Sequence, residues 1–382
     1  MGVNVVCGRN PADGKRVRIT VEHGLVQSIE EARGSEEAWL APGLIDLQVN
    51  GFAGSDLNAD KLDPDVVVSL SERLVATGVT TYLPTLITDV EEKLEARLAA
   101  ITAARRANQL VAHMVPSVHI EGPHISPEDG FRGAHPREHV RMPSVAEFDR
   151  WQSACGGIVG MVTMSPHYPN SCEYIAALVA RGIHVAIGHT SADHQQIYRA
   201  VEAGARLSTH LGNGIALQLP RHPNTLWTQM AHDGLMATLI ADGHHLPAET
   251  IKTIVRAKSI SRSILISDSV ALAGMPPGLY ETAVGGRVEL HPDGKLTMAE
   301  ESLLAGATLP LKDALLKAMA MCDISLHEAL PMATRNPGRF AGGRGKLCVG
   351  APADIIRFTI NSDHAALHLK TVMVQGKEWS SV

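Results

Sequence analysis

The sequence predicts an α/β protein: a closed (β/α)8 barrel of the TIM type, with a small β-sandwich domain built from both chain termini. Short Val/Ile/Leu-rich runs alternate with longer amphipathic stretches through most of the 382 residues. Such alternation is typical of a parallel sheet covered by helices. Eight apolar runs within about 300 residues fit a closed barrel. An open doubly wound sheet is the alternative, but no G-x-G-x-x-G motif opens a first strand–helix unit.

The predicted barrel strands are mostly apolar without strict alternation, because strands of a parallel barrel are buried on both faces. In chain order they are Leu44 to Asn50, Val79 to Pro84, Met114 to Glu121, Ile158 to Met164, Ile183 to Gly188, Arg206 to His210, Met236 to Ala241 and Ile264 to Asp268.

Amphipathic stretches between these runs predict the helices. The first opens with Asp63-Pro64, an N-cap residue followed by proline at the first helical position. Glycine follows the helical pattern at Gly78, Gly182 and Gly204, where a helix C-cap is expected. The predicted helices include Asp63 to Thr77, Cys172 to Arg181, Asp193 to Ala203 and Ala248 to Lys258.

The two chain ends have a different pattern, with short β-type runs separated by turn signals. Residues 1–42 and 341–382 are therefore predicted to form one small β domain beside a barrel of residues 43–340. Asp293-Gly294 predicts a further β excursion near Arg287 to Met298. The terminal runs are Arg16 to Val21, Leu25 to Ile29, Ala353 to Phe358 and Leu367 to Val374.

Composition excludes several classes of protein. With 45% hydrophobic residues, 19% charged residues and a net charge of −6, the chain is neither disordered nor fibrous, and it lacks the basic character of a nucleic-acid binder. No uncharged apolar run approaches the roughly 20 residues of a membrane helix. The five cysteines are scattered, without CxxC spacing, and the first residues do not resemble a signal peptide. A cytoplasmic protein without membrane or nucleic-acid partners is expected.

Histidine is unusually frequent, with 19 residues against five Phe, five Tyr and four Trp. Fourteen of the histidines fall between His113 and His245, and histidine is the commonest metal ligand and general acid or base. The segment Gly122 to Pro143 is long, lacks periodicity and is rich in Pro, Gly and His, which is typical of a functional loop. Histidines outside the predicted barrel strands are expected at the surface: His23, His291, His364 and His368.

Four polar residues lie at the ends of predicted strands, where barrels of this type carry their active sites. Glu121 ends the third strand, His189 follows the fifth, His210 ends the sixth and Asp268 ends the eighth. Two imidazoles and one carboxylate form the ligand set of a catalytic zinc site, and Asp268 would then be free to transfer protons. The alternative is that His189 and Asp268 merely cap helices.

These motifs together resemble the amidohydrolase superfamily, and within it the deacetylases of N-acetylated amino-sugar 6-phosphates. The segments Glu121-Gly122-Pro123, Gly188-His189-Thr190, Thr209-His210-Leu211 and Ser267-Asp268 are the most specific. Further matches are Ala41 to Asp46, His119 to Ile120, Gly133 to Pro136, Ala241 to His245, Leu304 to Gly306 and Gly350 to Asp354.

The resemblance implies a role for each matching position. Glu121, His189 and His210 match the ligands of one divalent metal ion per subunit, expected to be Zn2+, although Fe2+, Co2+ or Mn2+ would also fit. Asp268 matches the catalytic acid/base, and His135 matches the histidine that polarises the acetyl carbonyl. The implied substrate-binding residues are Asn213, Gly214, Arg221 and His245.

The resemblance also implies a homodimer. Arg221 matches an arginine that binds the substrate phosphate, in this family often in the neighbouring subunit's site. A guanidinium suits that task because it forms bidentate, charge-assisted hydrogen bonds with phosphate.

The chain departs from the superfamily pattern at two places. Gln48-Val49-Asn50 stands where most members carry His-x-His, so a single metal ion is expected, because amides are poor zinc ligands. The segments 212–216 and 221–224 also differ from the family pattern, and they lie at the substrate end of the site.

The implied activity is removal of acetyl from an amino-sugar 6-phosphate, such as N-acetylglucosamine-6-phosphate, giving glucosamine-6-phosphate and acetate. Two alternatives stay open at this point. One is hydrolysis of a different N-acyl or cyclic amide on the same barrel. The other is a non-catalytic metal-binding relative, although such a protein has no need for the unligated Asp268.

Overall fold

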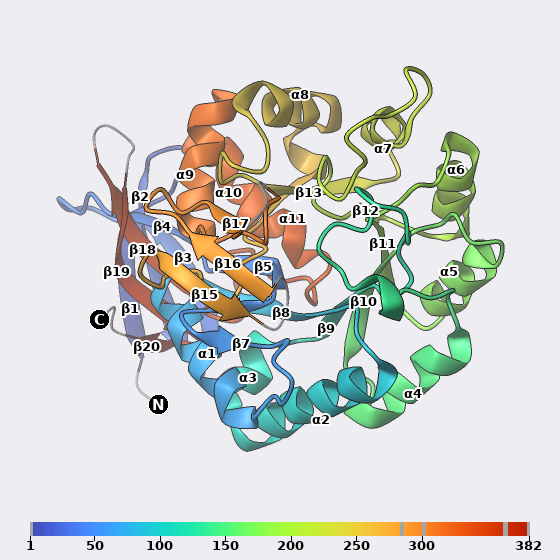
Figure 1. Cartoon of the computed structure of the whole chain (residues 1–382). Helices are drawn as coiled ribbons and strands as arrows, with labels where there is room; N and C mark the ends of the chain where they lie inside the picture. The colour runs from blue at the N-terminus through green and yellow to red at the C-terminus, as the bar shows by residue number, and fades with distance from the viewer. Residues whose placement is uncertain (1–2, 283–285, 300–302, 362–365, 380–382) are drawn as a thin grey trace.

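The computed structural model describes residues 3–282, 286–299, 303–361 and 366–379, and it confirms the (β/α)8 barrel (Figure 1). Parallel strands follow the order β14-β13-β12-β11-β10-β9-β8-β5, and a parallel bridge between Val49 and Ser269 closes the ring. The strands are β5 Leu44–Val49, β8 Val79–Ile87, β9 Val118–Glu121, β10 Val159–Met164, β11 His184–Ile187, β12 Leu207–Ser208, β13 Met236–Ile240 and β14 Ser263–Ile266.

One predicted strand boundary is wrong. The run from Met114 was expected to be β throughout, but Met114 ends helix α3 and the strand begins only at Val118. Asn108 caps that helix by accepting hydrogen bonds from the backbone of the next turn. Pro116 lacks the N–H that a ladder requires, so the strand starts beyond it.

Helices surround the barrel, and the predicted ones are confirmed within a few residues. Asp63 caps α1 by accepting a hydrogen bond from the backbone N–H of Asp65. The helices are α1 Pro64–Ala76, α2 Glu91–Ala107, α3 Gln109–Met114, α4 Val145–Cys155, α5 Ser171–Val179, α6 His194–Ala203, α7 Thr225–Ala231, α8 Ala248–Lys258, α9 Leu311–Cys322, α10 Leu326–Ala333 and α11 Arg335–Gly338, with short 3-10 turns η1 Arg137–His139 and η2 Ile260–Arg262.

Both chain ends join in one seven-stranded sheet, of order β20-β19-β18-β4-β1-β2-β3, which forms the predicted small domain. An isolated bridge pairs Leu25 at the start of β3 with Pro352, just before β18. The sheet therefore curves around an apolar core that includes Val26, Ile355 and Met373. The division at residues 42/43 and 340/341 stays a prediction. The strands are β1 Asn4–Arg9, β2 Arg16–Glu22, β3 Leu25–Glu31, β4 Trp39–Pro42, β18 Ile355–Ile360, β19 Leu367–Val374 and β20 Lys377–Trp379.

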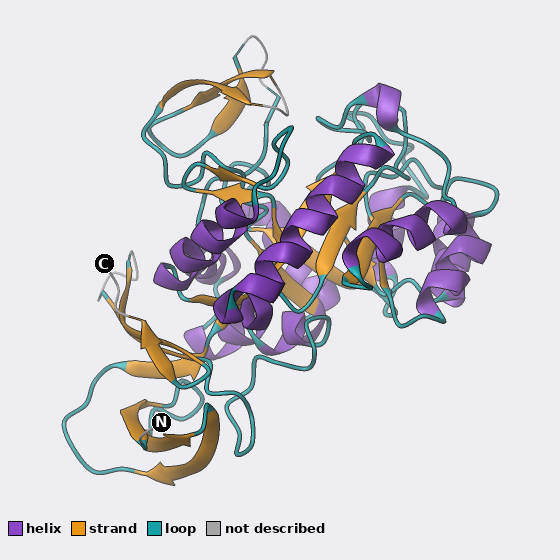
Figure 2. Cartoon of the chain, turned by 90° about the horizontal axis from the view of Figure 1, so that it is seen from below, coloured by secondary structure: helices purple, strands orange, loops and turns teal. Residues whose placement is uncertain are grey.

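Two small sheets lie in the loops of the barrel. The predicted β excursion is confirmed as an antiparallel sheet of β15 (Gly278–Thr282), β16 (Gly286–Leu290) and β17 (Leu296–Met298). Figure 2 shows this sheet and the terminal domain at opposite ends of the barrel. A hairpin of β6 (Gly51–Phe52) and β7 (Ser55–Asp56) follows the first barrel strand. None of the described helices is long and apolar enough to cross a membrane.

Candidate metal and catalytic site

The barrel brings together the four polar residues predicted at strand ends. Glu121 is the last residue of β9, and His189, His210 and Asp268 each stand two residues beyond a strand end. These last three residues have φ values of 47°, 29° and 49°. A left-handed backbone is uncommon for residues other than glycine and is often found at functional sites, so the turns after these strands aim the side chains at some cost in conformational energy.

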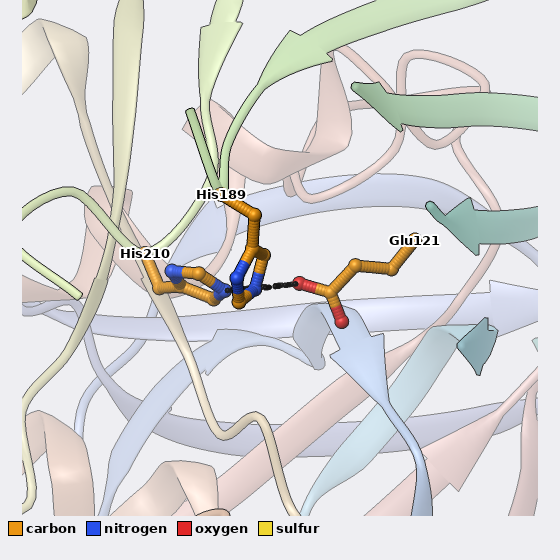
Figure 3. Close-up of side chains that lie close together, drawn as sticks. All are labelled: Glu121, His189 and His210. Carbon is orange, nitrogen blue, oxygen red and sulfur yellow. Dashed lines mark hydrogen bonds and ion pairs between the residues drawn. The ribbon is translucent and has the colours of Figure 1, made fainter. Parts of the chain in front are cut away.

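Three of these side chains present donor atoms to one point (Figure 3). Glu121 Oε1 lies 2.9 Å from His210 Nε2 and 3.4 Å from His189 Nε2, and the two imidazole nitrogens are 3.1 Å apart. Ligands bound to tetrahedral zinc at 2.0–2.1 Å are separated from one another by roughly 3.3 Å. The observed spacings bracket that value, so the buried set Glu121, His189 and His210 fits a divalent metal ion.

The surroundings of His189 orient its ring for such a role. Nδ1 lies 2.9 Å from the carbonyl oxygen of Phe131, and because a carbonyl only accepts, Nδ1 carries the proton and Nε2 presents a lone pair. Gly133 and Gly214 flank the ring. A Cβ atom at Gly214 would lie 2.7 Å from His189 Nδ1, so the predicted substrate residue Gly214 packs directly against a metal-binding side chain.

Gln48 and Asn50 replace the usual histidines of strand one, and each binds a carboxylate of the site. Gln48 Nε2 donates to Glu121 Oε1 at 2.9 Å, and Asn50 Nδ2 donates to Asp268 Oδ1 at 2.8 Å. Amides are poor zinc ligands beside imidazoles, so Gln48 and Asn50 are suited to holding the two carboxylates by hydrogen bonds.

Asp268 faces the donor cluster without joining it. Burial, with the like charge of Glu121 as a further contribution, raises the pKa of Asp268 to about 8. A carboxyl group whose pKa lies near neutrality is suited to take up and return a proton.

His135 reaches the same site from the long loop after β9. Its ring centroid is 4.4 Å from that of His189, and its Nδ1 lies 2.8 Å from the Thr88 hydroxyl. Burial, followed by the nearby His189, lowers the pKa of His135 to about 3. The imidazole is therefore neutral, and in the tautomer with the proton on Nε2, Thr88 donates to Nδ1 and the Nε2–H is available as a hydrogen-bond donor.

A cavity of about 750 Å³ opens over these groups and includes most of the predicted substrate residues. Asn213, Gly214 and His245 line it, and His245 Nδ1 is held 2.7 Å from Asp242 Oδ2. Burial alone would raise the pKa of Asp242, but the hydrogen bond and charge of His245 lower it to about 2. Arg221 is exposed on the segment between β12 and α7 and is not part of the cavity lining.

The cavity also contains residues that the sequence did not single out. Asp56 and Asn58 come from the hairpin after the first strand, and Ile87 ends the second strand. The sequence does place these residues at or after the ends of barrel strands, and that position could have identified them. The loops after the strands form the face of a TIM barrel that carries the active site. Apolar residues of the segments 270–272 and 303–306 form the wall beneath the three-stranded sheet.

The histidines expected at the surface are mostly there. His23 and His368 are exposed, while His291 is half-buried and its Nε2 lies 3.0 Å from the Thr297 hydroxyl. His364 lies outside the described residues.

The chain is similar to known proteins over nearly its whole length. The model of the amidohydrolase family matches residues 39–379, nearly the whole chain. The chain belongs to the amidohydrolase family. This amidohydrolase is 30% identical to an N-acetylglucosamine-6-phosphate deacetylase of Bacillus subtilis over 351 residues, which cover 90% of this chain and 86% of the relative.

Two further relatives show how far the similarity extends. An N-acetylgalactosamine-6-phosphate deacetylase of Escherichia coli is 30% identical over 365 residues, 94% of each chain. The crystal structure of an N-acetyl-D-glucosamine-6-phosphate deacetylase from Mycobacterium smegmatis superposes with a TM-score of 0.86 at 26% identity, covering 98% of this amidohydrolase and 99% of that chain. The barrel and the terminal domain are thus shared over the full length.

Proposed function

We propose that this amidohydrolase removes acetyl from an N-acetylated amino-sugar 6-phosphate, with N-acetylglucosamine-6-phosphate as the first candidate. The supporting observation is the convergence of Glu121, His189 and His210 beside an unligated Asp268 at the floor of one cavity. A metal-binding module needs the first three residues only, whereas hydrolysis also needs a group that transfers protons. The relatives named above are deacetylases of amino-sugar phosphates.

The metal ion would be held by Glu121, His189 and His210, and we propose Zn2+ from the ligand set. Such an ion lowers the pKa of a bound water molecule and polarises a carbonyl oxygen.

The remaining chemistry falls to the side chains of the chain itself. Asp268, as a carboxylate, takes a proton from the attacking water as its oxygen bonds to the amide carbon. His135 donates a hydrogen bond from Nε2 to the carbonyl oxygen as negative charge develops there. Protonated Asp268 then gives its proton to the departing nitrogen as the C–N bond breaks. One water molecule is consumed. Its second proton passes from the carboxylic acid product to the amine, so the products are the protonated amine and acetate.

Substrate binding would rely on Asn213, Gly214 and His245. The positive charge that binds the phosphate would come from outside the cavity. The described lining contains the carboxylates of Asp56, Glu121 and Asp268 but no lysine or arginine. A phosphate dianion requires a cation in this setting. We therefore propose a homodimer in which Arg221 of one subunit binds the phosphate in the site of the other, in a cytoplasmic enzyme.

A substrate panel tests the proposal. Purified protein would be analysed for bound metal and assayed with N-acetylglucosamine, N-acetylgalactosamine and their 6-phosphates. We expect about one metal ion per chain and kcat/KM at least roughly tenfold higher for the phosphorylated sugars. Equal rates with and without phosphate would reject the sugar-phosphate assignment, and absence of both metal and hydrolysis after zinc addition would reject the enzyme.

A further inference from the structure

One wall of the cavity carries two polar side chains and follows the first and second barrel strands, across the barrel from Asn213 and His245. It consists of Asp56, Asn58 and the neighbouring Ile87, and we call it the Asp56 wall. None of its residues is used in the mechanism above. The wall is distinct in chemistry from the apolar segments 270–272 and 303–306 of the same cavity.

Asn58 holds the Asp56 wall in a fixed conformation. Its side chain donates to the carbonyl oxygen of Thr85 at 3.0 Å and accepts from the backbone N–H of Ile87 at 3.0 Å. It is 3% exposed, so both bonds are shielded from water. The hairpin itself is attached to the segment after Asp268, through the 2.7 Å bond from Gly54 N to Ala271 O. A rigid wall of this kind is suited to selecting between substrates.

The charge of Asp56 is not balanced by a contact. Its carboxylate accepts one hydrogen bond, from the backbone N–H of Asn58 at 2.8 Å, and no ion pair with it occurs among the described residues. Arg97, the nearby cation, instead pairs with Asp89 at 2.9 Å and donates to the Asn58 carbonyl. Burial raises the pKa of Asp56, while the backbone N–H of Asn58 and the positive charge of Arg97 act in the opposite direction. Asp56 therefore brings an acidic side chain without an ion-pair partner, among the described residues, to the lining of the cavity.

The position of His135 relates this wall to one part of the substrate. His135 is bonded to Thr88, the residue directly after Ile87, and Ile87 is paired in register with Glu121. If His135 polarises the acyl carbonyl, the acyl group lies near the ends of β8 and β9. The sugar then extends toward Asn213 and His245 across the cavity. The acyl end of the substrate is therefore the part that approaches the Asp56 wall.

We propose that Asp56 is a specificity-determining residue that selects the N-acyl group by charge, accepting neutral acyl groups and excluding those with an anionic tail. This inference rests on the proposed amide hydrolysis and on His135 polarising the carbonyl. The physical basis is repulsion between two negative charges in a partly desolvated cavity, where few water molecules screen them. Asp56 forms no bond to the reacting atoms and moves no proton.

The test compares two acyl groups of equal length on glucosamine 6-phosphate. The N-succinyl derivative ends in a carboxylate, and the N-succinamoyl derivative ends in the isosteric neutral amide. Values of kcat/KM and, by calorimetry, Kd are measured for both with wild type and with Asp56→Asn. This substitution keeps Oδ1 as the acceptor for the Asn58 backbone and removes only the charge. Asp60→Asn is the matched control, because Asp60 loses the same charge four residues away, where its side chain is 84% exposed.

We expect wild type and Asp60→Asn to favour the neutral derivative by at least about tenfold, and Asp56→Asn to reduce this preference to about threefold or less. Asp56→Glu, which restores the charge, should recover it. An unchanged preference in Asp56→Asn, or none in wild type, would overturn the inference. The proposed function is judged separately: wild-type protein that fails to hydrolyse the N-acetyl compound rejects that function, while the calorimetric ratio still tests Asp56.

Discussion

The two sides of the cavity are built in different ways. On the metal side, Glu121, His189, His210 and Asp268 stand at or just after strands of the closed barrel, so the sheet fixes their separation. On the phosphate side, Arg221 is carried by an exposed segment that contains no strand and that leaves the side chain away from the cavity. The same chain thus combines a set of polar groups fixed by the barrel with an exposed arginine that, in the proposed homodimer, binds the phosphate in the other subunit's site.

This difference separates the residues proposed for hydrolysis from those proposed for substrate selection. A barrel tolerates changes in the loops after its strands far better than changes in the strands, because the strands are packed on both faces. The segments 212–216 and 221–224, where the sequence was expected to depart from the family pattern, lie outside the strands. Substitutions on the two sides should therefore have effects of different kinds as well as different sizes.

The largest effect is expected from loss of a metal ligand. His189→Ala removes one of three donors, so both metal content and hydrolysis should fall by more than the roughly 10–100-fold typical of outer-shell changes. Metal analysis after dialysis, together with kcat/KM, measures this. His23→Ala is the control, since His23 is exposed in the terminal domain. Retention of stoichiometric metal by His189→Ala would place the ion elsewhere.

Asp268→Asn should separate proton transfer from metal binding. The amide keeps the shape of the side chain but accepts no proton, so kcat should fall roughly 10²–10⁴-fold while metal content stays at the wild-type level. Steady-state kinetics on metal-loaded protein would measure the first quantity and elemental analysis the second. Near wild-type turnover would show that another group is the base.

Metal loading should also release a proton from Asp268. In the metal-free protein the pKa of Asp268 is about 8, so at pH 7 the carboxyl is mostly protonated. A cation beside Glu121 favours the carboxylate and lowers that pKa, so binding at pH 7 should release up to about one proton. Calorimetry in buffers of different ionisation enthalpy counts these protons. Asp268→Asn should release fewer protons on metal binding than wild type does. An equal number of protons would show that another group releases them.

Local sequence patterns predicted that Glu121, His189 and His210 lie close together, and the structure brings these three side chains to one place. Strand ends, a carboxylate and two imidazoles follow from local patterns, and the barrel then dictates that these groups meet. The boundary at Met114 was wrong because the apolar residues Met114 and Val115 continue from the end of a short helix, and Pro116 delays the start of the strand to Val118. Asp56 was missed for a different reason: a single acidic residue in a glycine-rich hairpin carries no signal until the fold shows that it faces the cavity.

Arg221→Ala tests the phosphate side. Loss of a charge-assisted contact worth about 1.5–3 kcal/mol should raise KM for the 6-phosphate roughly 10–150-fold and leave unphosphorylated sugars unaffected. Arg199→Ala, another exposed arginine, serves as the control. In a 1:1 mixture of Arg221→Ala and Asp268→Asn subunits, about half of the dimers are mixed and each of these has one intact site. The mixture should therefore regain roughly a quarter of wild-type activity. No recovery on mixing would place Arg221 in its own subunit's site.

The smallest effect is expected far from both sides of the cavity. Asp63→Ala removes the N-cap of α1, whose acceptor bond with the Asp65 backbone should be worth about 1 kcal/mol. The melting temperature should therefore fall by about 2 °C, while kcat/KM at 25 °C is unchanged. Asp65→Ala leaves the Asp63 cap intact and should lower the melting temperature less. If Asp63→Ala instead lowered kcat/KM, the positions of the metal-side residues would depend on the outer helices. The proposed contrast, in which the barrel strands fix the reactive groups and the loops determine substrate selection, would then be wrong.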